Sequence, residues 1–305
     1  MKTFVTGSTG FIGSHLCKRL VEDGNETIAL VRDIIPSKWL DEALKGCIKV
    51  RGDFRNFPLL KRILVQYEIK NVFHIGAMAS VKSAHKDPVN VFDTNVMGTV
   101  KVLEACRQAD VEKTLVVITD KVFGERMNAV PEDPLQSSEP YATSKVGAQL
   151  ACETYQKTYG LKVIIVRLCN VYGMDRSNRI VPNTIRKCLR EESPIIFSNE
   201  TESVRQYIHI QDVVDAMTFL MDKKVYHPSV KGYNICTPDV FNQEDLVNII
   251  QRFFPKVKPK YVTRKDRPKE ILKQTMTLSK CGWTPKIGLQ EGIQKTILGF
   301  EEYGY

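Results

Sequence analysis

The segment Phe4-Val-Thr6-Gly7-Ser-Thr-Gly10-Phe-Ile-Gly13 decides the fold of this chain. A short apolar strand breaks into a glycine-rich turn, and the apolar residues that follow at helical spacing predict a helix. Glycines let backbone amides approach a diphosphate at a helix N-terminus, where partial positive charge collects. Glycines also make plain turns, but between a first strand and a first helix they favour dinucleotide binding. The candidate cofactor contacts in this segment are Gly7, Thr9, Gly10, Phe11, Ile12 and Gly13.

The composition is that of a globular protein and carries no nucleic-acid, membrane or metal-binding motif. The chain has 305 residues, which suggests about two domains, with 43% hydrophobic and 26% charged residues. Its 8 cysteines form no C-x-x-C pair, which predicts reduced thiols rather than a disulfide or zinc framework. The net charge of +9 comes from scattered residues and indicates a lysine-rich surface. Because no signal peptide or membrane span is found, we expect a cytoplasmic protein.

The second strand, Thr27 to Val31, ends in Arg32-Asp33, where the adenosine ribose of a dinucleotide should lie. A carboxylate there accepts hydrogen bonds from a 2′-hydroxyl, as in NAD, whereas an arginine pairs with the 2′-phosphate of NADP. Both residue types are present, so either cofactor fits. Arg32 follows the strand directly and favours NADP, and the alternative for both residues is an exposed ion pair.

Four more residues are candidate cofactor contacts because they follow strands or interrupt an apolar face. Asp53 would lie near the adenine amino group, or cap the helix that begins near Asn56, and Phe54 would lie beside the adenine ring. Ala77, after the strand that ends in His74, is small enough for a cofactor to pass. Asn95 stands in an otherwise apolar helix and needs partners, which an active-site contact would supply.

The catalytic candidates follow the fifth strand, Thr114 to Ile118. Thr119-Asp120-Lys121 leaves that strand, and Tyr141-Ala-Thr-Ser-Lys145 opens a helix after Pro140. Tyr141 and Lys145 are one turn apart and share a face, so the lysine cation should favour the phenolate and make the tyrosine a base. Asp120 and Lys121 add an acid/base pair that alcohol oxidation alone does not require.

Five motifs in this order resemble those of the extended short-chain dehydrogenase/reductases that act on nucleotide sugars, and the resemblance covers nearly the whole chain. The motifs are Gly7-x-x-Gly10-x-x-Gly13, the Thr119 region, Tyr141-x-x-x-Lys145, Asn170-Val-Tyr-Gly173 and Arg205-x-Tyr-Ile-His209-Ile-x-Asp212. The resemblance implies an α/β fold, with a Rossmann-type doubly wound parallel sheet and a smaller C-terminal α/β substrate domain. It also implies a tightly bound NAD or NADP that is recycled within each turnover, and a homodimer.

We expect the Rossmann domain over residues 1–172 and the sugar-nucleotide domain over 173–305, with the segment of about 205–236 returning to the junction. The resemblance places Asn170 and Arg205 on the diphosphate of the substrate. Arg179 has equal claims to a phosphate contact and to holding a helix start, whereas Asp212 is expected to cap the helix that follows it. Arg267 resembles a late diphosphate-binding arginine, with a solvated charge run as the equal alternative. The helices of about 88–108 and 141–158, apolar on more than one face, suit a dimer interface.

Thr119-Asp120-Lys121 resembles the 4,6-dehydratases that act on UDP-N-acetylglucosamine or CDP-glucose, whereas epimerases of the family carry no such acid/base pair. In that chemistry Tyr141 acts as base while carbon 4 is oxidised, Lys121 takes the carbon 5 proton and Asp120 protonates the leaving hydroxyl on carbon 6. The alternatives are a 4-epimerase, a 4-ketoreductase and, from another class, a non-catalytic dinucleotide-binding regulator. Retention of Thr119, Tyr141 and Lys145 together argues against the regulator.

Overall fold

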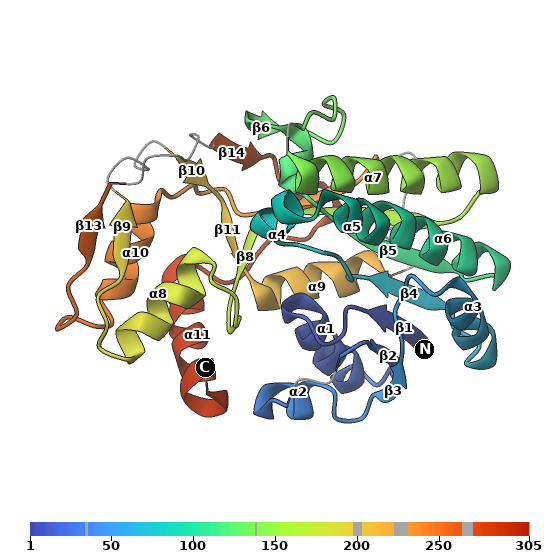
Figure 1. The fold of residues 1–305 in the computed structure, drawn as a ribbon, viewed down its shortest axis with the longest axis horizontal. Helices are drawn as coiled ribbons and strands as arrows, with labels where there is room; N and C mark the ends of the chain where they lie inside the picture. Colours follow the sequence, from blue (N-terminus) through green and yellow to red (C-terminus); the bar gives the residue numbers. More distant parts are fainter. Residues whose placement is uncertain (34–35, 138, 198–202, 223–230, 264–270, 305) are drawn as a thin grey trace.

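A parallel sheet of seven strands forms the centre of the protein, in the order β12-β7-β5-β4-β1-β2-β3 (Figure 1). The computed structural model describes residues 1–33, 36–137, 139–197, 203–222, 231–263 and 271–304. The strands are β1 (Lys2–Thr6), β2 (Glu26–Val31), β3 (Ile48–Arg51), β4 (Asn71–His74), β5 (Lys113–Thr119), β7 (Val163–Leu168) and β12 (Tyr233–Ile235). The strand order changes direction between β1 and β4, and ligands of open α/β sheets bind beyond the carboxyl ends of strands at such a point.

Helices cover both faces of the sheet, which confirms the predicted doubly wound architecture. On one face lie α1 (Phe11–Glu22), α2 (Lys38–Ala43) and α9 (Ile210–Leu220), and on the other α3 (Phe57–Gln66), α6 (Gly98–Gln108) and α7 (Pro140–Tyr159). Alternate residues of β5 feed the two cores: Leu115 and Val117 pack on the first side, Val116 and Ile118 on the second. The strand is therefore a continuous apolar run, as expected for a parallel strand buried on both faces.

The helix expected over 88–108 is a helical run with an internal π-helical turn. It consists of α5 (Pro88–Phe92), the π-helical η1 (Asp93–Met97) and α6, and it follows the short α4 (Val81–Lys86). A π-turn inserts an extra residue into the hydrogen-bond ladder and often marks a functional position. Here the turn contains Asn95, a predicted cofactor contact.

The second part of the chain builds a smaller unit around a third apolar cluster, between α8 (Ile180–Leu189), α10 (Gln243–Gln251) and α11 (Leu289–Tyr303). Its small sheets pair β8 (Asn170–Tyr172) with β11 (Tyr207–His209), β9 (Ile195–Phe197) with β13 (Lys260–Val262), and β14 (Ile271–Gln274) with both β10 (Val204–Arg205) and β6 (Arg126–Ala129). The chain then returns to the large sheet, because β12 pairs with β7 and α9 packs against α1. The exact domain limits stay a prediction, and Arg267 lies outside the described residues.

Asp212 does not cap α9, which corrects the sequence interpretation. The helix begins at Ile210, and the Nδ1 atom of His209 accepts the capping hydrogen bond from the Gln211 amide. Asp212 lies in the first turn, where its carboxylate accepts the backbone amides of Lys286 and Ile287, each at 3.0 Å. The aspartate therefore fixes the loop that leads into α11 rather than the start of its own helix.

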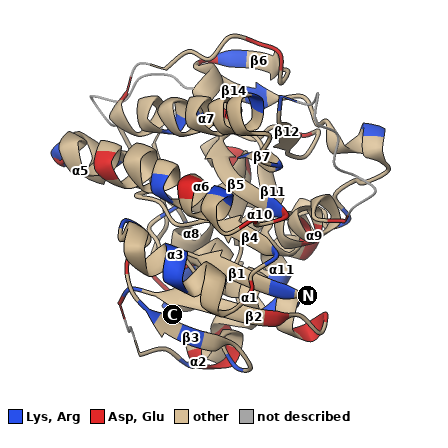
Figure 2. Ribbon diagram, turned by 90° about the vertical axis from the view of Figure 1, so that its right-hand side faces the viewer, with Lys and Arg blue, Asp and Glu red and all other residues tan. Residues whose placement is uncertain are grey.

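Surface charge and cysteine placement agree with the composition. In the view of Figure 2, basic and acidic residues alternate along α6, whereas α3 carries only basic ones. All 8 cysteines are free, and most are buried. Within the described ranges no helix is both long and apolar enough to cross a membrane, and no cluster of candidate metal ligands occurs.

Candidate active site

The glycine turn between β1 and α1 has backbone geometry that only glycine accommodates. Gly7 has a φ of +71°, and a Cβ atom there would lie 2.7 Å from the backbone nitrogen of Gly76. A Cβ at Gly13 would lie 2.1 Å from the carbonyl oxygen of Gly7. Gly10, the N-cap of α1, provides no side-chain cap, so the first amides of the helix remain directed at an anion. This turn fits the diphosphate of a dinucleotide.

Arg32 and Asp33, at the carboxyl end of β2, form an ion pair with 2.6 Å between Nε and Oδ2. Their side chains are 62% and 60% exposed, so the pair itself contributes little to stability. Both groups remain beside the position expected for the ribose. The exposed ion pair that was the alternative for these two residues is therefore present, and their contact with a ribose stays a prediction.

Asp53 and Phe54 lie in environments that the sequence did not predict. Three donors of Arg55, its backbone amide, Nε and Nη2, bond the Asp53 carboxylate, and Asn56 rather than Asp53 caps α3. Burial raises the pKa of Asp53, but the hydrogen bonds and charge of Arg55 outweigh it and lower the pKa overall. The Phe54 ring packs under Gly76 and Gly98 and is 9% exposed. It is a core side chain, and its contact with an adenine stays a prediction.

Asn95 finds its partners within the protein, so an active-site contact is not needed to satisfy it. Its side-chain amide donates to the Ser144 hydroxyl at 2.9 Å and to the Met78 carbonyl at 3.1 Å, and its oxygen accepts from the Met78 amide. The asparagine thus ties the loop after β4, which contains Ala77, to α7. It thereby holds the loop whose Gly76 lies directly against Gly7 of the glycine turn.

Thr119, Asp120 and Tyr141 come together at the carboxyl end of β5. The Thr119 hydroxyl donates to Asp120 Oδ1 at 3.1 Å and accepts from the Lys121 amide at 3.4 Å. Helix α7 begins at Pro140, with the Glu139 carboxylate accepting the amides of Tyr141 and Ala142. Thr119 and Asp120 are 8% and 7% exposed, so this polar cluster is largely removed from water.

The predicted effect of Lys145 on Tyr141 is wrong for this structure. Burial raises the pKa of Tyr141 to about 12; the Arg179 charge and the Thr119 hydroxyl lower it, while the charges of Asp120 and Glu139 raise it. Burial also lowers the pKa of Lys145 to about 8, and its Nζ atom donates to the Val117 carbonyl at 2.9 Å. Desolvation therefore dominates the pKa of both groups, and neither is among the charges that shift the pKa of the other.

The three predicted substrate contacts lie on different elements of the smaller unit. Asn170 begins β8, and its side chain donates to the Gln206 carbonyl at 3.2 Å. Arg205 lies on β10, with its backbone bridged to Phe241. Arg179 precedes α8, and its guanidinium is 3.8 Å from the Asp175 carboxylate and near enough to Tyr141 to affect its pKa. Of the three, Arg179 is the one whose effect on the catalytic cluster is evident.

Three residues near the cluster were missed from the sequence. Glu139 holds the first amides of α7, and Lys273 and Gln274 of β14 line a small void together with Asp120. Glu139 has the signal of an acidic residue before a helix-starting proline. Lys273 and Gln274 carry no local signal, because they reach Asp120 only through the pairing of β14 with β6.

The fold and the glycine turn define a Rossmann-type dinucleotide-binding protein, and the cluster of Thr119, Asp120 and Tyr141 at the end of its fifth strand is its candidate catalytic site. Comparison with known families gives the finer class: residues 3–236 match the model of the NAD dependent epimerase/dehydratase family, and the chain belongs to that family. The family is NAD-dependent, and the preference for NADP that Arg32 suggested gains no support.

Individual relatives include both reaction types. A putative UDP-glucose 4-epimerase of Methanocaldococcus jannaschii is 28% identical over 96% of both chains. A dTDP-D-glucose 4,6-dehydratase of Dictyostelium discoideum is 28% identical over 73% of this chain and 56% of its own. The crystal structure of the Thermus thermophilus UDP-glucose 4-epimerase with NAD, 28% identical, covers 99% of both chains with a TM-score of 0.88. The comparisons therefore leave the choice between epimerase and dehydratase to the residues of the site.

Proposed function

We propose that this protein is a sugar-nucleotide 4,6-dehydratase, which converts an NDP-hexose to an NDP-4-keto-6-deoxyhexose. The observation that carries the proposal is the buried Asp120 carboxylate, hydrogen-bonded to Thr119 at 3.1 Å and close enough to Tyr141 to affect its pKa. An epimerase needs an acid/base group only at carbon 4. An additional acid/base group beside Tyr141 is needed only if water is eliminated across carbons 5 and 6.

NAD is the proposed cofactor, held by the glycine turn, Arg32 and Asp33 at the ribose, and Tyr141 and Lys145 near the nicotinamide. When bound, it supplies reversible hydride transfer at carbons 4 and 6 and, when oxidised, a positive charge beside the phenol. The turn geometry at Gly7 and Gly13 supports this assignment. Lys145, fixed to Val117, offers its remaining ammonium protons to a ribose hydroxyl or to Tyr141.

The protein side chains divide the proton transfers among them. Tyr141 takes the proton of the carbon 4 hydroxyl, which Thr119 orients by a hydrogen bond. The ketone formed at carbon 4 acidifies the proton on carbon 5, and Lys121 in its neutral form removes that proton. Asp120 in its acid form protonates the hydroxyl that leaves carbon 6. Burial of Thr119 and Asp120 excludes water from these steps.

The substrate diphosphate is assigned to Asn170, Arg179 and Arg205. Arginine forks suit two adjacent phosphate groups, because each presents several donors in a fixed plane. The influence of Arg179 on Tyr141 supports its placement between the diphosphate and the sugar. The nucleotide base and the sugar stereochemistry are left to the experiment below.

A 4-epimerase is the second candidate, because relatives that match nearly the whole chain include epimerases as well as dehydratases. Both the Methanocaldococcus jannaschii protein and the Thermus thermophilus structure are described as UDP-glucose 4-epimerases. In that reaction the 4-keto intermediate is reduced on its opposite face, and Asp120 and Lys121 take no part. The two candidates share Tyr141 and differ in whether water is lost.

Mass spectrometry of the products separates these candidates. The purified enzyme is incubated separately with UDP-N-acetylglucosamine, CDP-glucose, dTDP-glucose, GDP-mannose and UDP-glucose, without added reductant, beside a matched Tyr141→Phe sample. Loss of one water from one substrate, absent with Tyr141→Phe, is the expected result. A product of unchanged mass that separates chromatographically as an isomer would identify the epimerase instead.

We also propose a homodimer formed through α5, α6 and α7. These helices lie side by side at the surface (Figure 1), and several of their apolar side chains are exposed. They include Val89 of α5, 79% exposed, and Leu150 of α7, 50%, and Met97 of η1, between α5 and α6, is 47% exposed. A second copy of the same face would bury these groups by isologous packing.

A further inference from the structure

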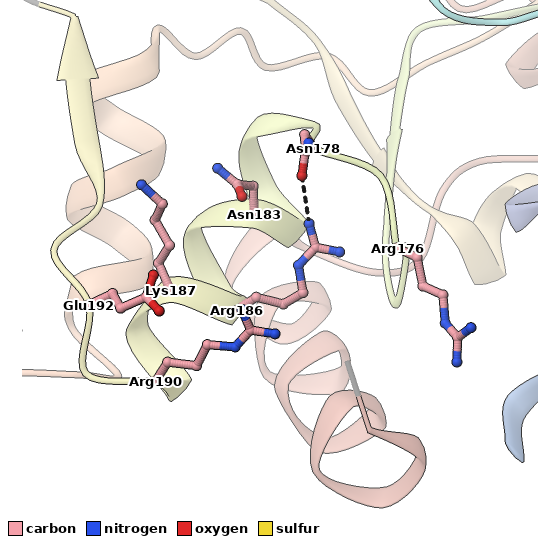
Figure 3. Close-up of a pocket in the computed structure, with 7 residues that line it drawn as sticks. All are labelled: Arg176, Asn178, Asn183, Arg186, Lys187, Arg190 and Glu192. Atoms are coloured by element: carbon pink, nitrogen blue, oxygen red, sulfur yellow. Dashed lines mark hydrogen bonds between the residues drawn. The ribbon is translucent and has the colours of Figure 1, made fainter. Parts of the chain in front are cut away.

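A cavity of about 530 Å³ opens beside α8 (Figure 3), and neither Tyr141 nor Lys145 is among the residues that line it. This volume lies within the range of small-molecule sites. The basic side chains around it are Arg176, Arg186, Lys187 and Arg190. Two amides, of Asn178 and Asn183, and one carboxylate, of Glu192, complete the lining.

The cationic groups share one face of α8 because of their spacing. Asn183, Arg186, Lys187 and Arg190 recur at helical intervals, whereas Val181, Ile185 and Cys188 point into the third apolar cluster. Three cations near the last turn of the helix are tolerated because the unpaired carbonyls at a helix C-terminus carry partial negative charge. Two acidic residues are nearby, Glu192 in the lining and Asp175 before the helix, and they are fewer than the four cations of the lining.

Arg186 gives the cavity a defined shape. Its guanidinium donates to the carbonyl oxygens of Asp175 at 3.1 Å and Ser177 at 2.6 Å, and to the side-chain oxygen of Asn178 at 3.3 Å (Figure 3). These bonds tie the loop before α8 to the helix. The wall that carries Arg176 and Asn178 is thereby fixed relative to Lys187.

Arg176, Arg186, Lys187 and Arg190 give the lining an excess of positive charge over the one carboxylate of Glu192. Across the described part of the chain, neither Arg176 nor Lys187 takes part in a salt bridge. Burial lowers the pKa of Arg186; the charge of Asp175 opposes this effect, and that of Arg190 adds to it. An anion bound among these side chains would relieve the repulsion between like charges.

We infer that this cavity binds the diphosphate group of a small phosphorylated molecule, at a site additional to the active site. Arginine and lysine side chains hold the phosphate oxygens, and the two asparagine amides meet hydroxyl groups of the ligand. The site also adjoins the active site through the chain, because Asn178 is followed by Arg179, whose charge acts on Tyr141. The diphosphate of a nucleotide and inorganic pyrophosphate share this chemistry.

Calorimetric titration of the full chain with inorganic pyrophosphate and with UDP tests the inference. We expect Lys187→Glu with Arg190→Glu to weaken pyrophosphate binding by about tenfold or more. The matched control is Lys61→Glu with Arg62→Glu, two exposed cations on α3, which should leave it unchanged. Glu192→Gln should strengthen binding. UDP should bind at two sites per chain in the wild type and at one in the Lys187/Arg190 variant.

The result that overturns the inference is equal weakening in the α8 and α3 variants, or none in either. Displacement of pyrophosphate by a single-stranded oligonucleotide at a lower concentration than by UDP would also overturn it, because the surface would then bind a nucleic acid. Lys187→Ala alone, checked by circular dichroism, keeps the test usable if the double variant does not fold. Tyr141→Phe should bind pyrophosphate normally, so failure of the dehydratase proposal and failure of this one are distinguishable.

Discussion

Lys145 of α7 donates a 2.9 Å hydrogen bond from Nζ to the carbonyl oxygen of Val117 in β5. This contact joins the helix that begins beside Tyr141 to the strand that ends in Thr119. Both partners are buried, the lysine 5% exposed and the valine 8%. The catalytic cluster is therefore held by a bond between rigid elements rather than by loops, as an accurately positioned site requires.

Tyr141→Phe should abolish oxidation at carbon 4 while leaving the fold intact. The hydroxyl is the proposed base, and loss of such a group lowers kcat by about 10²–10⁴-fold. Steady-state product formation measures the effect. Tyr155→Phe is the control on the same helix, because its hydroxyl bonds Glu104 far from the cluster. Comparable activity losses in the two variants would reject the assignment to Tyr141.

Asp120→Asn and Lys121→Ala should permit oxidation at carbon 4 but stall the elimination. Single-turnover absorbance should then show reduced nicotinamide accumulating. The rate of water loss should fall by about 10²-fold or more. This split between the two half-reactions distinguishes acid/base roles from a general loss of structure. If both variants retained full dehydration, the proposed division of roles would be wrong.

Gly13→Ala should destabilise the protein although alanine favours helices. The propensity gain is at most about 1 kcal/mol, whereas the new Cβ atom would lie 2.1 Å from the Gly7 carbonyl oxygen, a backbone atom that cannot move aside cheaply. We expect a net loss of about 3 kcal/mol in the free energy of unfolding, together with lost NAD binding. Denaturant titration and cofactor fluorescence measure both.

The control for that substitution is Gly288→Ala, at the N-cap of α11, where a Cβ atom would meet nothing within 4 Å. It should cost less than about 1 kcal/mol. Equal losses at the two glycines would show that the close approach to Gly7 is not what destabilises Gly13→Ala.

Stability should decrease as the pH falls below about 6.5. Burial lowers the pKa of His15 to about 4 and those of His74 and His209 to about 3. Below about pH 6.5 the unfolded chain therefore binds protons that the folded protein does not. The contribution of these histidines to the free energy of unfolding is complete above the unfolded pKa and is lost as the pH falls towards the folded pKa values. Each histidine contributes a slope of at most about 1.4 kcal/mol per pH unit.

Denaturant titrations between pH 6.5 and 5 test this slope with histidine variants. His74→Asn should reduce the change of the free energy of unfolding with pH by the contribution of one histidine. His85→Asn, at an exposed position on α4, should not reduce it. An unchanged slope in His74→Asn would show that His74 is not responsible.

Leu150→Glu should convert the proposed dimer to a monomer. A charge at the centre of an apolar interface is left desolvated and unpaired, which typically costs several kcal/mol of association energy. Light scattering after size-exclusion chromatography measures the mass. Val65→Glu, on α3 and 56% exposed, is the control away from the proposed face. A dimer that survives Leu150→Glu would place the interface elsewhere.

The local patterns that predicted the fold correctly were those with a strong backbone requirement. The glycines of the first turn and the continuous apolar run of β5 each restrict the chain to few conformations, and both lie as expected. The caps were less reliable, because several polar residues near a helix start compete for the same amides, as with His209 and Asp212.

The sequence by itself determined the parallel α/β fold, the position of the glycine turn and the residues that end β5, since strand and helix periodicity and glycine stereochemistry are local properties. Only the tertiary structure decided how those residues behave. Burial set the pKa values of Tyr141 and Lys145 against the direction that their spacing suggested. Packing placed Phe54 in the core, and strand pairing brought Lys273 beside Asp120. Desolvation and long-range contacts depend on the whole fold, and no local pattern contains them.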